Sequence, residues 1–208
     1  MKRKMRVYFA NGLFSEADRD YNEKVAQQIE ALGIEVYLPQ RNASINDKTK
    51  AASATMVYDG DTDELKRADV LVAAIDGPVI DAGVAAEIGW CAGWNEICDS
   101  KFMEDIRETL KGNARHVGDD PSKVNVPIIK PMIGLYTDCR EMSRTINDAK
   151  VKMSSSELGE NQFPYANIYV TGALKKYGKI VSNTNDLLDS LNQLLKFSMR
   201  EVNKYGQT

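Results

Sequence analysis

The run ADVLVAAIDG, residues 68–77, is followed closely by DAGVAAEIGWCAGW, residues 81–94, and this pair decides the fold. The first run is apolar and ends in Asp-Gly, which is typical of a buried strand ending in a turn. The second run places small and apolar residues at helical spacing. A strand followed at once by a closely packed helix predicts one βα unit of a parallel sheet.

The predicted helix carries one formally charged residue between Ala82 and Trp94, which is Glu87. Burying a carboxylate among apolar neighbours is costly unless it has a partner or a chemical role. Because this helix is expected to begin near Gly83, its dipole should favour the ionised form and offset part of the cost. The alternative is a structural carboxylate paired with an Arg or Tyr from elsewhere in the chain. Glu87 is therefore the first residue to explain.

The remaining chain repeats the alternation of strand and helix. Further strands are expected within residues 5–14, 34–39, 130–138 and 178–183. Further helices are expected between 15 and 33, within 51–67, at 102–111, 139–152 and 163–177, and from about 185. Ser15 suits an N-cap and Gly33 a C-cap. The order predicts an α/β fold, a flavodoxin-like doubly wound sheet of five parallel strands with helices on both faces.

The length suits a single domain spanning residues 1–208. The rhythm breaks at about 95–126, where a charged helix leads into the turn-rich GNARHVGDDPSKVN, residues 112–125. We interpret this region as a helical and loop insertion. The lone His116 lies in it and is expected to be a solvated loop residue, because no Cys or His has the spacing of a metal-ligand partner.

Composition excludes several classes of function. A net charge of -3 gives no general attraction to nucleic acid or to an anionic membrane. The three cysteines have no CxxC spacing, which argues against a disulfide framework and favours a reducing compartment. No apolar run is long enough for a membrane span and no signal region is evident, so we expect a cytoplasmic protein.

The motifs of cofactor and triad chemistry are missing. The turn ANGLFS, residues 10–15, matches neither a dinucleotide fingerprint nor a Walker A loop, so no nucleotide cofactor is expected. A lone His and the lack of GxSxG disfavour a catalytic triad, and no metal site is expected. The strand ends instead present carboxylates: Asp61, Asp76, Asp81 and Glu87.

Two carboxylates around a pocket suit chemistry at an anomeric carbon, with one as nucleophile and the other as proton donor or acceptor. Glu87 fits the nucleophile, because a glycosyl ester divides a difficult displacement into two steps. Asp81 precedes the helix and could face the leaving group. It could equally serve as the N-cap of that helix.

Four segments in this order resemble the nucleoside 2-deoxyribosyltransferase family: YFANGLFSEADRDYN, EVYLPQR, ADVLVAAIDG with DAGVAAEIGW, and GLYTDCR. The D-x-G-x-x-x-E pattern of residues 81–87, combined with the other segments, is the most specific part. The resemblance covers most of the chain apart from residues 95–126. It implies an enzyme that moves a 2-deoxyribosyl group between nucleobases through a covalent ester on Glu87, with net retention.

The resemblance also implies roles for other residues. Asp81 and a second Asp would contact or protonate the base, and Asp61 matches that second Asp best by its spacing to the strand at 68–77. Asp59 and Asp63 remain alternatives for this role. Tyr8 matches a Tyr that hydrogen-bonds the nucleophile and crowds the 2′ side of the sugar.

Substrate binding is implied for four residues of the family pattern: Phe14, Gln40, Gly83 and Asn167. Phe14 and Gln40 match positions that sandwich and read the base. Asn167 matches an Asn that a neighbouring subunit contributes to hold the 5′-hydroxyl. The implied partners are 2′-deoxynucleosides, free nucleobases and further copies of the chain, in a dimer or a trimer of dimers with shared sites.

Two other functions stay open. A 2′-deoxynucleoside 5′-monophosphate N-glycosidase would share the fold and the Glu but needs a phosphate pocket, and GLFS offers only Ser15. A non-catalytic nucleotide-binding sensor is the other alternative, and a buried Glu87 without a partner argues against it. Purine or pyrimidine preference depends on the permissive segment at 40–55.

Overall fold

The computed structural model describes residues 3–43, 53–77, 79–117, 128–138, 143–146, 149–152 and 166–205. Its main sheet has five strands, all parallel, in the order β2-β1-β3-β4-β7. The strands are β1 (Arg6–Ala10), β2 (Glu35–Tyr37), β3 (Val70–Ala74), β4 (Met132–Leu135) and β7 (Gly178–Val181). This is the flavodoxin-like order, so the predicted fold class is confirmed.

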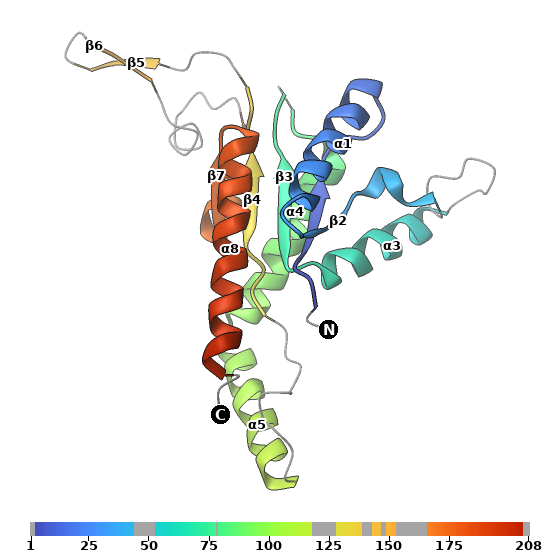
Figure 1. Cartoon of the computed structure of the whole chain (residues 1–208), viewed down its shortest axis with the longest axis vertical. Helices are drawn as coiled ribbons and strands as arrows, with labels where there is room; N and C mark the ends of the chain where they lie inside the picture. Colours follow the sequence, from blue (N-terminus) through green and yellow to red (C-terminus); the bar gives the residue numbers. More distant parts are fainter. Residues whose placement is uncertain are drawn as a thin grey trace.

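Helices cover both faces of this sheet (Figure 1). One face packs against α1 (Glu16–Glu30) and α8 (Thr184–Tyr205). The other face packs against α3 (Ala54–Arg67), α4 (Ala82–Cys98) and α7 (Ile168–Lys176). Since side chains alternate along a strand, Val7 and Phe9 point to the first face while Tyr8 and Ala10 point to the second. Tyr8 therefore lies on the same side of the sheet as α3 and α4.

Local capping explains where α1 begins and ends. The Ser15 hydroxyl accepts the Asp18 amide N–H at 3.0 Å, as predicted for the N-cap. The C-cap is Ala31 rather than the predicted Gly33. Gly33 follows two residues later with φ +81°, in the left-handed region that glycine adopts without strain, and leads the chain into β2.

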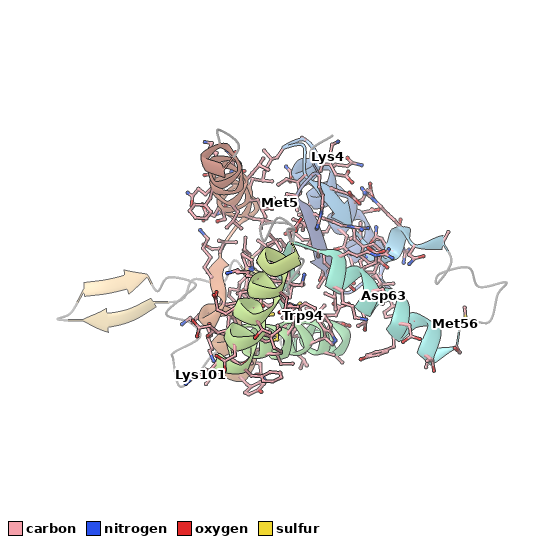
Figure 2. The ribbon with its side chains drawn as sticks, turned by 90° about the horizontal axis from the view of Figure 1, so that it is seen from below. Lys4, Met5, Met56, Asp63, Trp94 and Lys101 are labelled. Carbon is pink, nitrogen blue, oxygen red and sulfur yellow. The ribbon has the colours of Figure 1, made fainter. Side chains whose placement is uncertain are left out.

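The predicted helix at 139–152 is wrong. Its described residues form two antiparallel strands, β5 (Ser143–Ile146) and β6 (Ala149–Lys152). Thr145, Ile146 and Val151 are of β-branched residue types, which are enriched in strands. The hairpin stands apart from the main sheet in both views (Figures 1 and 2). The serine-rich stretch at 154–159, which we interpret from the sequence as a linker, lies outside the described residues.

The region interpreted as an insertion is helical over much of its length. Helix α4 runs past Trp94 to Cys98, and α5 (Lys101–Val117) extends the helix expected at 102–111. The backbone of His116 is thus helical, and the predicted loop position is wrong. Residues 118–127 lie outside the described part of the chain. Figure 1 shows α5 projecting beyond the end of the sheet. Within the described ranges, no helix has both the length and the apolar character needed to cross a bilayer.

Strands β4 and β7 approach closely at one glycine. Gly178 pairs with Met132, and a Cβ atom added there would lie 1.8 Å from the Met132 carbonyl oxygen. Backbone cannot yield as a flexible side chain can, so this position accepts no side chain without moving a strand.

A short 3₁₀ helix, η1 (Pro39–Arg41), follows β2 and carries Gln40.

Candidate functional site

Glu87 finds its partner on the first strand. The Tyr8 hydroxyl donates a hydrogen bond to Glu87 Oε1, and Tyr8 itself is fully buried. Glu87 is half-buried in the second turn of α4. The structure therefore brings together two predicted residues that are far apart in the sequence. Tyr8 lies in the middle of β1, in register with Tyr37, the last residue of β2.

A second tyrosine–carboxylate pair lies beside the first. The Tyr37 hydroxyl donates to Asp61 Oδ1 at 3.0 Å, and Asn42 Nδ2 donates to the Tyr37 hydroxyl oxygen at 3.0 Å. The rings of Tyr8 and Tyr37 are in contact, with centroids 5.2 Å apart and planes inclined by 36°. Two carboxylates, each held by its own tyrosine, thus meet near the carboxyl ends of β1 and β2.

Burial dominates the electrostatics of Glu87. Desolvation raises the pKa of Glu87 to about 7. The hydrogen bond from Tyr8 lowers this pKa in part, and the charges of Asp61 and Asp81 raise it further. The helix dipole contributes little, because Glu87 is the sixth residue of α4 and lies beyond its first turn. At neutral pH this carboxyl group is poised between its two protonation states.

Three aspartates of α3 were candidates for the second acidic position: Asp59, Asp61 and Asp63. Of these, Asp61 faces Tyr37 and the site. Burial raises the pKa of Asp61, the hydrogen bond from Tyr37 lowers it, and the nearby Glu64 raises it. Asp59 is exposed, and Asp63 forms an exposed ion pair with Lys66 at 3.0 Å. Figure 2 shows Met56 at the end of α3 far from the sheet and Asp63 closer to it.

Asp81 is the N-cap of α4, the structural alternative considered for it. Its Oδ1 accepts the amide N–H of Gly83 at 2.9 Å and of Val84 at 3.1 Å. A Cβ atom at Gly83 would lie 3.0 Å from that oxygen, so a small residue suits this position. The negative charge of Asp81 also helps to raise the pKa of Glu87.

A buried asparagine that the sequence reasoning missed organises the loop after β1. Asn22 Nδ2 donates to Gly12 O and to Gln40 Oε1, both at 2.9 Å, and Asn22 Oδ1 accepts from Asn11 Nδ2 at 2.7 Å. Gln40 Nε2 in turn donates to Arg19 O at 3.0 Å. The Gln40 amide is thus already bonded at both ends, and a base could use only its second N–H or its second lone pair.

Phe14 and Asn167 lie apart from this tyrosine–carboxylate cluster. Phe14 is 81% exposed in the loop between β1 and α1. Asn167 is the N-cap of α7, where its Oδ1 accepts the amide N–H of Tyr169 at 3.0 Å and of Val170 at 3.2 Å. Both side chains lie at the surface of this single chain.

Other groups near the strand ends have structural roles. Asp76 accepts from the Thr137 amide at 2.5 Å and from the Thr137 hydroxyl at 2.7 Å, which ties the end of β3 to the end of β4. Burial raises the pKa of the Cys91 thiol to about 12, so the thiol stays protonated and is a poor nucleophile. Within the described ranges, no three His, Cys, Asp or Glu side chains are grouped to hold a metal ion.

A groove of about 530 Å³ runs between α4 and α7. Ala85, Gly89 and Gly93 of α4 and Ala173 of α7 lie along it, while Glu87 is not among its lining residues. The groove is therefore distinct from the carboxylate cluster.

The sequence reasoning also missed Tyr37 and Asn42. Both flank the LPQR segment that carried part of the resemblance, and Tyr37 ends a strand next to β1. That position was a usable signal, because neighbouring parallel strands end at the same edge of a sheet. The partner of Tyr37 on α3 could not be read from the sequence.

The fold and the cluster together define a class: doubly wound α/β proteins with paired carboxylates at the carboxyl edge of the sheet, suited to chemistry at an anomeric carbon. A sequence profile of the family described as nucleoside 2-deoxyribosyltransferase matches residues 7–162. The chain belongs to this enzyme family, which confirms the resemblance. The match ends before Asn167, so that assignment lies beyond it.

Solved structures resemble the chain to different degrees. A conserved protein from Enterococcus faecalis V583 is 34% identical, with 92% of this chain and 99% of that chain covered and a TM-score of 0.61. A 2-deoxyribosyltransferase from Bacillus psychrosaccharolyticus is 18% identical, with 88% and 90% covered and a TM-score of 0.49. The CMP N-glycosidase BcmB of Clostridium botulinum is 17% identical, with 91% and 98% covered and a TM-score of 0.45. The first of these structures shares the fold of this chain, and a search among curated proteins found no match.

Proposed function

We propose that this protein transfers the 2-deoxyribosyl group of a 2′-deoxynucleoside between nucleobases through a covalent ester on Glu87. The observation that supports this most is the pair of half-buried carboxylates, Glu87 and Asp61, each bonded to its own tyrosine. One carboxylate can then act as nucleophile while the other handles the proton of the base. The coarser assignment to the family rests on the sequence match.

The first half-reaction forms the ester. Tyr8 occupies Glu87 Oε1, which leaves Oε2 to bond to C1′ of the sugar. As that bond forms, the C1′–N bond breaks, its electron pair goes to the base, and Asp61 or Asp81 gives the base a proton. In the second half, an incoming base attacks C1′ and gives its N–H proton to the donor carboxylate, while the electron pair of the ester C1′–O bond returns to Glu87. Two inversions give net retention.

The protonation states support this division of work. Burial raises the pKa of both carboxyl groups, and the charge on Asp61 raises that of Glu87 further. The charge on either member opposes ionisation of the other, so such a pair takes up its first proton more readily than an isolated carboxylate does. A base nitrogen that accepts a hydrogen bond from Asp61 selects the state in which Glu87 is the anion.

Free nucleosides suit the site better than 5′-monophosphates. The N-terminus of α1, a natural place for a phosphate, is capped by the Ser15 hydroxyl, which also donates to Asp18 Oδ2 at 2.6 Å. Glu16 adds a second negative charge in the same turn. Both carboxylates would repel a phosphate.

The nearby cation is also engaged. The Arg41 guanidinium lies 2.6 Å from Glu23 Oε1 and 2.5 Å from Glu30 Oε1. These two glutamates neutralise it, so a phosphate would have to displace them. The monophosphate hydrolase is accordingly the weaker alternative.

The proposal extends to substrate binding and assembly. Phe14, exposed beside the site loop, would pack on the base, and Gln40 would read one of its edges. Asn167 would come from a neighbouring subunit to hold the 5′-hydroxyl, in a homo-oligomer. Light scattering coupled to size exclusion measures the assembly, and a monomer would contradict a shared site.

Base exchange is the direct test. Incubation with 2′-deoxyinosine and adenine should yield 2′-deoxyadenosine by chromatography, with little free deoxyribose when adenine is omitted. Mass spectrometry of the protein with donor alone should show one added 2-deoxyribosyl group, which Glu87→Gln should not acquire. Hydrolysis of dGMP or dCMP without any exchange would overturn the proposal in favour of the N-glycosidase.

A further inference from the structure

The hydroxyl of Tyr37 is bonded on both sides. It accepts a hydrogen bond from Asn42 Nδ2 at 3.0 Å and donates one to Asp61 Oδ1, also at 3.0 Å. Tyr37 ends β2, Asn42 follows η1, and Asp61 lies on α3, so three separate elements meet in this chain of contacts.

The chemistry of the three groups decides the direction of the chain. The NH₂ group of an amide can only donate, so the contact with Asn42 uses a lone pair of the Tyr37 oxygen. The single Tyr37 proton is then directed to Asp61 Oδ1. Asp61 Oδ1 accepts this hydrogen bond, so it cannot also carry a proton that points at Tyr37. A proton bound to Asp61 therefore belongs on Oδ2.

We propose that Tyr37, oriented by Asn42, is a positioning residue that keeps the transferable proton of Asp61 on Oδ2 and stabilises the carboxylate left when the base takes that proton. This inference rests on the proposed function and deepens it by selecting Asp61 as the proton donor. Asp81 is less suited to that role, because its Oδ1 already accepts two backbone amides as a helix cap.

The proposed step forms one bond to the sugar, breaks another and moves one proton. The Glu87 Oε2–C1′ bond forms as the C1′–N bond breaks, and the electron pair of the broken bond stays with the base. The Asp61 Oδ2–H bond gives its proton to a base nitrogen and keeps its electron pair, so Asp61 becomes an anion. The Tyr37 hydrogen bond to Oδ1 strengthens as that negative charge develops. The second half-reaction reverses each transfer with the incoming base.

The surroundings of Asp61 make this hydrogen bond matter. Two negative charges lie near Asp61: Glu64 on the same helix and Glu87 on α4. Both disfavour the ionised form of Asp61. Glu64 is partly neutralised by Arg6, 2.6 Å away. The Tyr37 hydroxyl lowers the pKa of Asp61, so losing it should make Asp61 a weaker acid toward the base.

The test compares two leaving groups in the Tyr37→Phe variant. Base release from 2′-deoxyadenosine depends on protonation, whereas 7-methyl-2′-deoxyguanosine already carries a positive charge on its base and needs no proton. First-turnover release is measured with enzyme in excess and no acceptor base, which isolates the first half-reaction. Tyr37→Phe should slow release from 2′-deoxyadenosine about 10- to 100-fold but change release from the methylated donor less than about threefold.

Two further variants complete the design. Asn42→Ala should show the same selective loss at smaller size, because the Tyr37 proton is then free to turn away. Tyr58→Phe alters an exposed tyrosine on the same helix as Asp61 and should leave both rates unchanged. Thermal melts check that each variant is folded.

The outcomes separate the two hypotheses. Equal losses on both donors, or no loss on either, would overturn the role of Tyr37 while the transferase proposal stands. If the wild-type protein releases no base from either donor, the proposed function fails and the inference falls with it.

Discussion

Replacing Glu87 by Gln should make the protein more stable at high pH while abolishing exchange. Gln keeps the shape and an oxygen that can accept the Tyr8 hydrogen bond. In the wild type, burial raises the pKa of Glu87 to about 7 from an ordinary value of 4.5. Between these values the unfolded chain binds fewer protons than the folded protein, so stability falls as pH rises. The contribution of Glu87 is thus complete below pH 4.5 and lost above pH 7.

The size of the effect follows from the two pKa values. The difference between about 7 and 4.5 corresponds to at most about 3 kcal/mol in the free energy of unfolding. Glu87→Gln escapes this loss, so it should exceed the wild type by up to that amount at pH 8.5 and match it near pH 4. For a chain of this length, the gain at high pH is about 6–12 °C in Tm.

Urea unfolding followed by circular dichroism, repeated at half-unit steps from pH 4 to 8.5, measures this difference. The exposed Glu16→Gln variant is the matched control and should show no gain of comparable size. A Glu87→Gln effect that is the same at every pH would refute the claim that Glu87 is held protonated by burial. Exchange above a few per cent of wild type would refute its role as nucleophile.

Three further perturbations test the surroundings of Glu87 and the sheet. Tyr8→Phe removes a hydrogen bond that lowers the pKa of Glu87, so the acid limb of the kcat/KM profile should move to higher pH, with about a tenfold loss at pH 7. Asp81→Asn should retain the α4 cap and stay within about 0.5 kcal/mol of wild type in urea unfolding, whereas Asp81→Ala should lose about 1 kcal/mol. Gly178→Ala should cost about 3 kcal/mol or more in the same measurement, because its Cβ meets the Met132 carbonyl.

Each of these expectations has a clear contrary result. An unshifted acid limb in Tyr8→Phe would mean that the hydroxyl does not tune Glu87. Exchange that falls equally in both Asp81 variants would assign chemistry to the carboxylate, whereas a loss confined to Asp81→Ala would assign it the cap alone. A Gly178→Ala protein of wild-type stability would contradict the close approach of β4 and β7.

Local signals in the sequence were enough for the main sheet. Apolar runs bounded by turn residues mark strands buried on both faces, and the helices between them follow from spacing and caps such as Ser15. The same reasoning failed at residues 139–152, where the described part pairs as β5 and β6. A strand pair of four residues each is too short to show a clear period of two in the sequence.

The sequence by itself determined the order of the βα units, and with it that Tyr8 and Glu87 end near the same edge of a parallel sheet. It also singled out Glu87, because one charge on an apolar helix is visible without coordinates. Only the tertiary structure decided which tyrosine holds which carboxylate, across 79 residues for Tyr8 and Glu87 and 24 for Tyr37 and Asp61.

Asp81 and Asp61 show why this division arises. From the sequence, Asp81 fitted both an N-cap and a residue that handles the proton of the leaving group. In the structure its Oδ1 accepts hydrogen bonds from two backbone amides. Asp61 could not be separated from Asp59 and Asp63 until the packing of α3 turned it toward Tyr37. Burial, hydrogen-bond direction and pKa depend on distances between elements remote in the chain, so local residue patterns do not contain them.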